Sequence, residues 1–527
     1  MQKTIQLKLT PSEAAHDESI RIACALSAGQ PLDLITGFHI LKSSIDARSR
    51  NTFIILTALV FVNEPMQPRN LFRINFKDVS RAPKRVAIIG SGPAGLFAAM
   101  KLLENGIRPV ILERGKDIRS RRRDLAILNK QGILNPESNY CFGEGGAGTY
   151  SDGKLYTRST KRGDVHRILN ILVQFGAEER ILFDAHPHIG TNKLPQIIAA
   201  MRKAILEAGG EIHFGKKLVD LEINNELVST VVTSDNERIH SDGIILATGH
   251  SARDIFHLFN KKNIDIEFKP FALGVRIEHP QQLIDCIQYT HLPGGIKKDW
   301  VRDEFLPPAS YGLVQQVNGL GVFSFCMCPG GIIAAASTAQ GELVVNGWSP
   351  SKRNNPFANS GIVVSVEEKN VKEFSAHRAL AGLYFQQSVE QKAFEAGGGK
   401  FVAPAQRMTD FVENNHSANL PDCSYLPGIN SALLSEVLPG FIYEGLAKAF
   451  IAFGKKMRGY YTREAVILAS ESRTSSPVRI PRDKELLHHP QIKNLFPCGE
   501  GAGYAGGIVS AAMDGERVAA QLIRILS

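Results

Sequence analysis

A strand, a glycine-rich turn, a helix and a second strand follow one another between residues 85 and 113, and this order constrains the fold more than any other feature. RVAIIG is a short apolar strand, SGPAGLFAAMKLLENG begins as a turn and continues with helical periodicity, and IRPVILERG is a second apolar strand. Strands joined through a helix in this way run parallel, because parallel strands need a crossover connection. The segment therefore predicts a βαβ unit and an α/β fold.

The turn of this unit contains the pattern GxGxxG, which occurs three times, beginning at Gly90, Gly143 and Gly501. With 47 glycines in 527 residues, one match alone carries little weight, because roughly a third of a match is expected by chance. Only the first match has a strand before it, a helix after it and an acidic residue, Glu113, at the end of the next strand. The first match therefore predicts a dinucleotide site.

Each residue type in the first match has a physical role. Gly90 permits the tight turn, Gly92 lets the backbone approach a pyrophosphate, and Gly95 lets the helix lie close to the strand. The free N–H groups at the start of the helix attract the anion. Glu113 is predicted to accept hydrogen bonds from the adenosine ribose, and the alternative is a solvated carboxylate at a strand end. NAD and FAD share this ADP half, so the first match does not distinguish them.

The third match favours FAD. It joins a strand to a helix, but no further strand and ribose carboxylate follow it, so we do not expect a second dinucleotide domain. A glycine loop that returns this late in the chain suits the ribityl and ring end of a longer cofactor. Gly506, Gly507 and Ile508 begin the last helix, whose N–H groups and partial positive charge are predicted to face the N1–C2=O edge of the flavin ring.

The remaining patterns divide the chain into four predicted parts. Residues 1–80 are predicted to form a small N-terminal α+β domain, followed by a proline-punctuated linker. Residues 84–265 form the first part of a Rossmann-like FAD-binding domain, and residues 485–527 complete it. Residues 266–484 mix strands with a helix near 377–395 and are predicted to be an inserted α+β substrate domain.

Charge and cysteine content indicate the expected binding partners and the expected cellular compartment. The formal charge of +9 is consistent with binding of a nucleic acid, with binding of an anionic cofactor, or with solubility alone. One local run, Arg119 and Arg121–Arg123, is either a solvated helix face or a phosphate-binding surface. The seven cysteines include no CxxC pair and no zinc-ligand spacing, and no apolar run approaches the roughly 20 residues of a membrane helix. We expect a cytoplasmic protein in a reducing compartment, with no metal site.

Several motifs together resemble one family. GSGPAG with VILERG, FGEGGAGTYSDGK, ATGHSARD, FCMCPGG, ESRTSSPVRI and CGEGAGYAGG are similar to the FAD-dependent dehydrogenases of the glutathione-reductase-like flavoproteins, from about residue 40 onward. The resemblance implies FAD contacts at Gly90, Gly92, Gly95, Glu113, Thr248, Gly249, Gly499 and Glu500. The predicted set is completed by Pro93, Ala94, Arg114, Arg122, Val219 and Ala247. Glu500 departs from the wider superfamily, where Asp is common, which puts its ribityl contact in doubt.

The segment FGEGGAGTYSDGK is predicted to be a loop, because no strand precedes it and it is too rich in glycine for the interior of an element. By resemblance it lies against the flavin and pyrophosphate, with contacts from Gly145, Gly146, Thr149 and Ser151. The alternative is a plain connecting loop. Lys154 is interpreted either as a charge near the flavin ring or as a surface lysine.

Three residues are candidates for catalysis. Arg473, followed by Thr474, Ser475, Ser476 and Arg479, suits an anionic substrate, since guanidinium groups bind carboxylates and phosphates bidentately. The alternative is a helix cap with surface charge. His250 could act as general acid or base, or have a structural role. Cys326 and Cys328 could form a redox pair, but CxC places both side chains on one face of a strand, where small core packing is usual.

The leading hypothesis is an FAD-dependent oxidoreductase that transfers hydride through flavin N5 to or from a small-molecule substrate, with NAD(P)H as a candidate transient donor. Two alternatives are a flavoprotein that acts on tRNA or another nucleic acid, and a flavin-bound sensor without turnover. The sequence does not indicate the substrate, the electron partners, a catalytic base, the oligomeric state or the role of residues 1–80.

Overall fold

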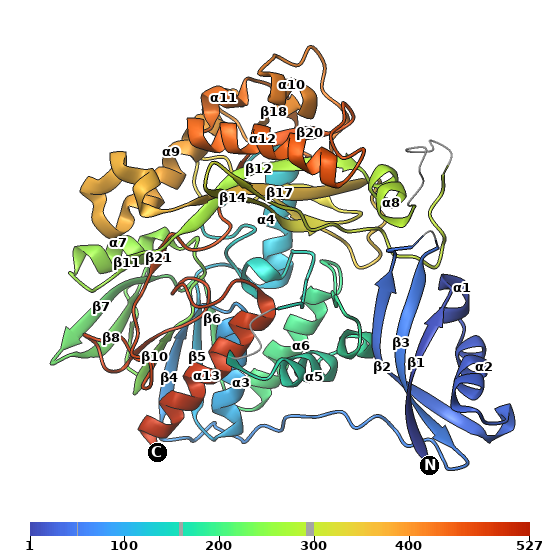
Figure 1. Cartoon of the computed structure of the whole chain (residues 1–527). Coiled ribbons are helices and arrows are strands. Elements are labelled where there is room, and N and C mark those ends of the chain that lie inside the picture. Colours follow the sequence, from blue (N-terminus) through green and yellow to red (C-terminus); the bar gives the residue numbers. More distant parts are fainter. Residues whose placement is uncertain (50, 158–161, 291–299) are drawn as a thin grey trace.

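The computed structural model describes residues 1–49, 51–157, 162–290 and 300–527. Its centre is a five-stranded parallel sheet with the strand order β22-β10-β4-β5-β6 (Figure 1). The strands are β4 (Arg85–Ile89), β5 (Arg108–Glu113), β6 (Glu211–Phe214), β10 (Gly243–Leu246) and β22 (Leu495–Pro497). The edge strand β22 comes from the end of the chain and pairs with β10. This arrangement confirms the predicted Rossmann-like α/β fold.

Both faces of the parallel sheet are covered. One face packs against α3 (Pro93–Glu104), α5 (Val165–Gln174), α6 (Leu194–Glu207) and α13 (Ile508–Leu526). The other packs against α7 (Arg253–Lys261) and the antiparallel strands β7 (Leu218–Asn224), β8 (Leu227–Thr233) and β9 (Arg238–Ile239). Along β4, Val86 and Ile88 join the first apolar cluster, whereas Ala87 and Ile89 join the second. This alternation explains why the strand is apolar at every buried position.

The turn between β4 and α3 depends on glycine. Gly90 has φ +105°, a left-handed conformation that residues with a Cβ rarely adopt. A Cβ atom on Gly95 would lie 2.0 Å from the carbonyl oxygen of Gly90, so the helix could not approach the turn with any larger residue. The roles predicted for these two glycines are confirmed by this geometry.

Between β10 and β22 the chain builds a second, larger sheet of seven strands. Its order is β13-β14-β17-β12-β20-β18-β19, and only β18 and β19 are parallel. The strands are β12 (Phe271–Pro280), β13 (Val314–Val317), β14 (Leu320–Cys328), β17 (Phe357–Val366), β18 (Ala403–Arg407), β19 (Ile429–Ser431) and β20 (Val466–Glu471). A short hairpin of β15 (Ile332–Ala335) and β16 (Val345–Trp348) accompanies it, and β11 (Glu267–Phe268) pairs with β21 (Val478–Arg479). We call residues 267–479 the insert.

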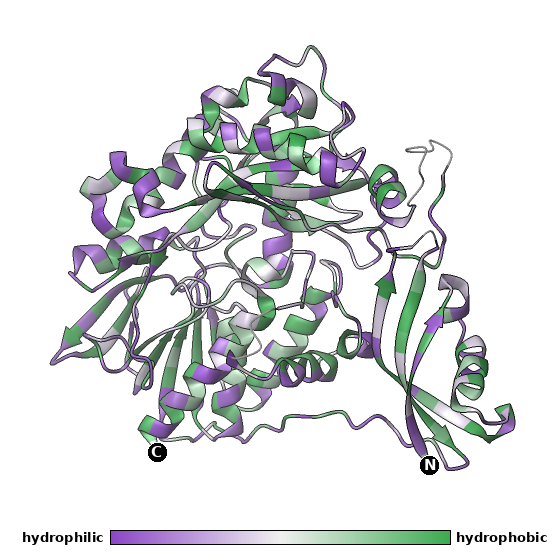
Figure 2. Ribbon diagram, in the orientation of Figure 1, coloured by the Kyte–Doolittle hydropathy of each residue, from purple (hydrophilic) through white to green (hydrophobic). Residues whose placement is uncertain are grey.

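Helices pack against this second sheet and connect it. They are α8 (Gln281–Tyr289), α9 (Ala381–Ala396), α10 (Met408–Glu413), α11 (Leu434–Val437) and α12 (Gly440–Lys456). The 3₁₀ segment Glu368–Leu380 leads directly into α9. Figure 2 shows hydrophobic residues along the strands of both large sheets and hydrophilic residues on the outer turns of the helices. In the described ranges, no helix combines the length and apolar character needed to cross a membrane.

The N-terminal unit is a separate three-stranded antiparallel sheet with the order β1-β3-β2. It contains β1 (Gln2–Leu9), β2 (Ile35–Asp46), β3 (Phe53–Val62), α1 (Pro11–Ala14) and α2 (Asp17–Ala28). Thr10 and Glu13 form a capping box at the start of α1. The unit touches the body through β2, where the N–H of Ser43 donates to the carbonyl of Phe183 at 2.8 Å.

The arginine run lies on α4 (Ile118–Gln131), and the structure corrects its interpretation. Arg119, Arg122 and Arg123 are exposed, but Arg121 is completely buried. Its guanidinium donates to the carbonyls of Asn139, Glu144 and Tyr140 at 2.8 to 3.0 Å. Arg121 therefore belongs neither to a solvated face nor to a phosphate-binding surface, because its donors hold the loop that follows α4.

We expect Arg121→Met to lower the free energy of unfolding by about 3 kcal/mol, because three buried carbonyls lose a charged donor. Urea unfolding monitored by circular dichroism measures the change. Arg122→Met, one residue away on the exposed side of α4, is the matched control and should change stability by less than about 0.5 kcal/mol. Equal effects of the two substitutions would contradict the structural role of Arg121.

Candidate functional site

All five loops that follow the parallel strands line one cavity of about 420 Å³. The contributing segments are Gly90–Ala94 after β4, Glu113 and Arg114 after β5, Lys216 and Lys217 after β6, Ala247–Ala252 after β10, and Glu500 with Gly506–Ile508 after β22. The carboxyl edge of a parallel sheet is where α/β proteins bind ligands. The first and third glycine patterns thus open into the same space.

The opposite wall comes from the loop 140–156 and from the insert. Phe325, Cys326, Ala334, Ala336, Asn346, Gly347, Trp348, Arg473 and Thr474 are its lining residues from the insert. The glycine segments nearly touch one another: a Cβ on Gly146 would lie 3.1 Å from Cα of Gly92, and one on Gly148 would lie 3.2 Å from Cγ1 of Ile508. The loop 142–154 therefore lies across both glycine turns.

Glu113 holds the loops of the first glycine turn together. Its carboxylate is 4% exposed and accepts the N–H and hydroxyl of Ser91 at 2.9 and 2.8 Å. It also accepts the N–H groups of Gly115 and Gly143 at 2.9 and 3.0 Å. Four donors fill the acceptor capacity of a carboxylate. Glu113 is therefore neither a solvated carboxylate nor, in this geometry, free to accept ribose hydroxyls, and its contact to the ribose receives no support.

The cavity fits an extended dinucleotide that contains a flavin. Helices α3 and α13 both begin without a side-chain cap, so their first N–H groups are available to anionic groups. The protein leaves free space at Gly92 and Gly506, where a Cβ would meet no described atom closer than 3.9 Å. Gly90–Ala94 would hold the pyrophosphate of FAD, and Gly506–Ile508 would hold its ring. Arg114 and Lys217 follow β5 and β6, on the side of the sheet away from β22.

Comparison with known proteins gives the family. Residues 84–253 match an FAD binding domain, residues 270–474 match the C-terminal domain-like family of FAD-dependent proteins, and residues 1–61 match a domain of unknown function (DUF8436). A protein of Clostridium beijerinckii described as uncharacterized is 38% identical over 512 residues, which cover 93% of this chain and 92% of the relative. The chain belongs to the same family as this clostridial protein. It binds FAD and is an FAD-dependent oxidoreductase.

More distant likenesses are limited to the fold or to one part of the chain. A thiamine thiazole synthase of Aeropyrum pernix is 26% identical over 182 residues, 32% of this chain and 55% of that protein. Among solved structures, tetracycline destructase Tet(51) aligns over 84% of this chain and 82% of its own, with 11% identity and a TM-score of 0.34. Glycine oxidase from Bacillus cereus aligns over 84% and 96%, with 13% identity and a TM-score of 0.31.

The structure of this flavoprotein brings most of the predicted residues to the cavity, but not all. Gly95, Arg122, Gly145, Thr149, Val219 and Gly499 do not line it. Val219 is 40% exposed, and the hydroxyl of Thr149 donates to the carbonyl of Glu144 at 2.8 Å. The N–H of Gly499 donates to Asp514 at 2.8 Å. Thr149 and Gly499 therefore support the loops behind the cavity wall.

Arg473 is not free to anchor a substrate. Its side chain is 5% exposed, and its Nη2 lies 3.0 Å from Glu390 and 3.2 Å from Glu342. Arg253 from α7 binds the same two carboxylates at 2.8 and 3.1 Å. Burial alone would raise the pKa of Glu390, but Arg253 and Arg473 hold it below its ordinary value. Both carboxylates are shared by the two arginines, so the predicted anion site at Arg473 stays a prediction without support from this geometry.

The other polar residues near Arg473 are also used within the protein. Arg479 does not line the cavity, and its guanidinium lies 5.7 Å from the centre of the Tyr504 ring. The hydroxyl of Thr474 donates to the carbonyl of Ala272 at 2.8 Å, and that of Ser476 donates to Val478 at 2.6 Å. Arg473 and Arg479 therefore do not form a substrate-binding pair.

His250 lies at the cavity wall between two fixed partners. Its Nε2 is 3.1 Å from the carbonyl of Arg473, and its Nδ1 is 3.5 Å from the carboxylate of Glu500. Since a carbonyl can only accept, this contact places a hydrogen on Nε2 and leaves Nδ1 facing Glu500. His250 thus links the segment at Arg473 to Glu500, and its predicted role as general acid or base stays a prediction.

Several cavity residues were not predicted from the sequence. Lys216 and Lys217 follow β6, and their position after a strand of the parallel sheet is a signal that could have found them. Asn346 and Trp348 belong to the β15–β16 hairpin of the insert, and no local pattern marks them. Glu390, which neutralises Arg473, lies in the middle of α9 and resembles an ordinary helix residue in the sequence.

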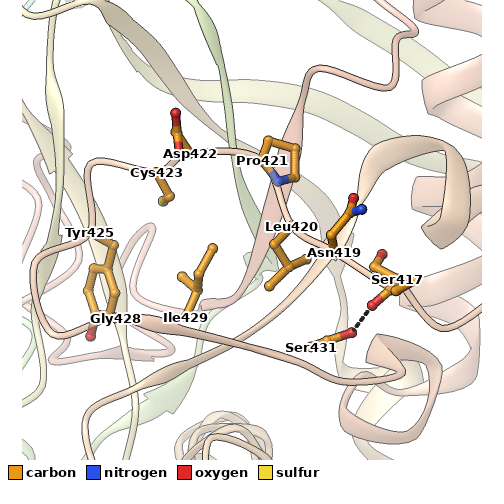
Figure 3. A pocket seen from close by; sticks show the side chains of 11 residues that line it. Ser417, Asn419, Leu420, Pro421, Asp422, Cys423, Tyr425, Gly428, Ile429 and Ser431 are labelled. Carbon is orange, nitrogen blue, oxygen red and sulfur yellow. Dashed lines mark hydrogen bonds between the residues drawn. The ribbon is translucent and has the colours of Figure 1, made fainter.

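A second hollow of about 430 Å³ lies in the insert, in the loops between α10 and β19 (Figure 3). Ser417, Asp422 and Cys423 are among its lining residues, and the hydroxyl of Ser431 donates to the carbonyl of Ser417 at 2.8 Å. No predicted site residue lines this hollow. Its lining residues include no group of converging charges comparable with the FAD cavity.

We expect Arg473→Ala to destabilise the protein by about 3 kcal/mol at neutral pH, because Glu342 and Glu390 are left with one arginine. A carboxylate whose folded pKa is lowered stabilises the protein above its ordinary pKa of 4.5 and loses that contribution as the pH falls. The difference between wild type and variant should therefore shrink below about pH 4.5. The urea midpoints of wild type and variant across this pH range measure the stability difference. Arg463→Ala, at an exposed arginine, is the control. A stability difference that does not change with pH would contradict the pairing of Arg473 with Glu390.

We expect Gly92→Val and Gly506→Val each to abolish FAD retention while the protein stays folded. Each new side chain fills space that the protein leaves open, one where the pyrophosphate would lie and one where the flavin ring would lie. The ratio of visible flavin absorbance to ultraviolet absorbance of the polypeptide in the purified protein measures bound flavin. Gly312→Val, at an exposed glycine with equally free space, is the matched control and should keep its FAD. Retention of FAD by the Gly506→Val variant would show that the third glycine pattern lies outside the cofactor site.

Proposed function

We propose that this flavoprotein is a dehydrogenase or reductase of the glutathione-reductase-like superfamily that transfers hydride between flavin N5 and a small-molecule substrate. The single observation that carries the proposal is the shared cavity of the first and third glycine patterns, which suits a cofactor held at both its diphosphate and its ring. When bound, FAD supplies a two-electron hydride acceptor and donor at N5.

The residues at the ring end favour this chemistry. Helix α13 is 19 residues long, and its uncapped first turn at Gly507 gives the N-terminus a partial positive charge. Such a charge stabilises negative charge that develops beside it, which favours acceptance of a hydride. Apolar side chains of the insert, among them Phe325 and Trp348, face the same space and limit access of water.

The substrate is proposed to bind between the parallel-sheet domain and the insert. Cavities between domains are common sites for small molecules, and here both domains contribute walls. The expectation of an anionic substrate rested on Arg473, whose charge is neutralised by Glu342 and Glu390. The proposal therefore keeps a small-molecule substrate and leaves its charge open.

NAD(P)H is proposed as the transient electron donor. The third glycine pattern lines the same cavity as the first, so it offers no second dinucleotide site, and a nicotinamide would dock and leave. Anaerobic mixing of the FAD-bound protein with NADH and then NADPH tests this. We expect one nucleotide to bleach the visible flavin absorbance within seconds and the other to act much more slowly.

Dithionite is the positive control in the same cuvette, because it reduces flavin without a specific site. Full reduction by dithionite combined with no reduction by either nucleotide would overturn NAD(P)H as the donor. The Gly312→Val variant, which should retain FAD, is expected to reproduce the wild-type rate.

A further inference from the structure

Strand β14 is irregular where it reaches the FAD cavity. Phe325 pairs with Gly361 and Cys328 with Asn359, so β14 has one residue more than its partner β17 over this stretch. Cys326 sits in this bulge with φ +46°, a left-handed conformation that is uncommon for any residue except glycine. Bulges turn a side chain away from the regular alternation of a strand. The sequence-based expectation of simple alternation at CxC is therefore wrong, and Cys326 lines the cavity.

The bulge brings two sulfurs and one amine together. The Sγ atoms of Cys326 and Cys328 are 3.9 Å apart, and Nζ of Lys154 lies 3.6 Å from each. The thiol of Cys328 is completely buried, and its Sγ lies 3.3 Å from the carbonyl oxygen of Cys326 and 3.9 Å from the Cys326 sulfur. One sulfur is thus at the cavity wall, the second lies directly behind it, and a cation faces both.

The charges around the pair favour a thiolate at Cys326. The ionisable groups that face the pair are Asp152 and Lys154 from the loop 142–154, Arg276 from β12, Tyr311 from the segment before β13, and Glu471 from β20. Nη2 of Arg276 donates to the carbonyl of Cys326 at 2.8 Å. Burial raises the pKa of Glu471 to about 8, and its carboxyl group lies 3.4 Å from Nη1 of Arg276.

The two thiols differ in the direction of their pKa shifts. The hydrogen bond from Cys328 and the charge of Lys154 lower the pKa of Cys326 below its ordinary value, against the effect of burial. The same hydrogen bond, together with burial, raises the pKa of Cys328. Burial acts to lower the pKa of Lys154, but the charges of Cys326, Cys328 and Asp152 outweigh it and raise this pKa. One thiolate and one thiol beside an ammonium group is the reactive state of a dithiol.

Neither core packing nor metal binding accounts for this cluster. Ordinary core packing would not surround two small residues with the ammonium group of Lys154 and with the buried guanidinium of Arg276, which pairs with Glu471 at 3.4 Å. A metal site would need a third ligand, and within the ranges that the structure describes no group of three His, Cys, Asp or Glu side chains is arranged to hold a metal.

We propose that Cys326 and Cys328 form a redox-active dithiol that exchanges two electrons with FAD. In the oxidising direction the Cys326 thiolate and the Cys328 thiol form one S–S bond, and two electrons and the Cys328 proton leave them. Bound FAD would supply the acceptor for both electrons and the proton, so charge and atoms balance. In the reverse direction the disulfide is cleaved and the electrons return. The sulfurs must approach by about 2 Å to reach bonding distance.

The first test counts thiols in the full-length protein. Protein is equilibrated in buffers of reduced and oxidised dithiothreitol, alkylated with N-ethylmaleimide and weighed by mass spectrometry. We expect the wild type to lose two of its seven reactive thiols at a single midpoint. Cys326→Ser and Cys328→Ser should lose none, whereas Cys141→Ser, which removes another thiol of the same cavity, should still lose two. Seven free thiols in folded wild type under oxidising conditions would overturn the proposal.

The second test examines Lys154, a positioning residue for the thiolate. We expect Lys154→Met to slow alkylation of Cys326 by iodoacetamide at neutral pH by about tenfold or more, because loss of the ammonium group raises the pKa of Cys326 and lowers its thiolate fraction. Lys154→Arg should restore most of the rate. Lys448→Met, which removes an exposed lysine of α12 that does not line the cavity, is the matched control and should leave the rate unchanged. An unchanged rate in Lys154→Met would contradict the role of this lysine.

The third test measures electron exchange and does not depend on NAD(P)H. The oxidised, FAD-bound protein is titrated anaerobically with dithionite. We expect the wild type to consume twice the reductant of Cys328→Ser, because the flavin and the disulfide each accept two electrons. Equal consumption, together with a disulfide found by the thiol count, would show that the dithiol and the flavin do not share electrons. Failure of NADH and NADPH to reduce the flavin would leave this measurement unaffected, so the two proposals fail separately.

Discussion

The carboxylate of Glu113 accepts four hydrogen bonds, and the geometry of the cofactor cavity depends on them. The donors belong to the turn after β4, to the residues after β5, and to the loop 142–154. Without this acceptor, three backbone N–H groups would be buried without partners, at a cost of about 1–3 kcal/mol each. A single buried charge thus determines how close the three loops lie, and their spacing leaves room for a diphosphate beside the start of α3.

A second set of buried charges fixes the opposite wall. Arg253 lies on α7 beside the parallel sheet, whereas Glu342, Glu390 and Arg473 belong to the insert. Such a network contributes less to stability than its Coulomb attraction suggests, because all four groups lose their hydration. Its main effect is positional, since bidentate guanidinium–carboxylate geometry tolerates few alternatives. The insert is therefore held in register with the FAD-binding domain, and the cavity between them has a defined shape.

The two ends of the cavity have different chemical character. At one end, glycine turns, lysines and an uncapped helix suit the ADP half of FAD. The start of α13, apolar side chains of the insert and Cys326 also line this cavity. Cys326, whose φ of +46° is uncommon for a residue with a side chain, lines this cavity, and the sulfur of Cys328 lies 3.9 Å from its own. Conformational strain and perturbed ionisation commonly coincide at such sites.

The sequence by itself determined the βαβ unit, the roles of Gly90 and Gly95, the late return of the chain to the sheet, and FAD as the cofactor, because these depend on contacts within short segments of known geometry. Only the tertiary structure decided the roles of charged and reactive side chains. Arg473 meets Glu390 across 83 positions, and Lys154 meets Cys326 across 172. Whether an arginine binds substrate or a buried carboxylate, and whether a cysteine packs or ionises, depends on which distant charge the fold places beside it. No local pattern contains that information.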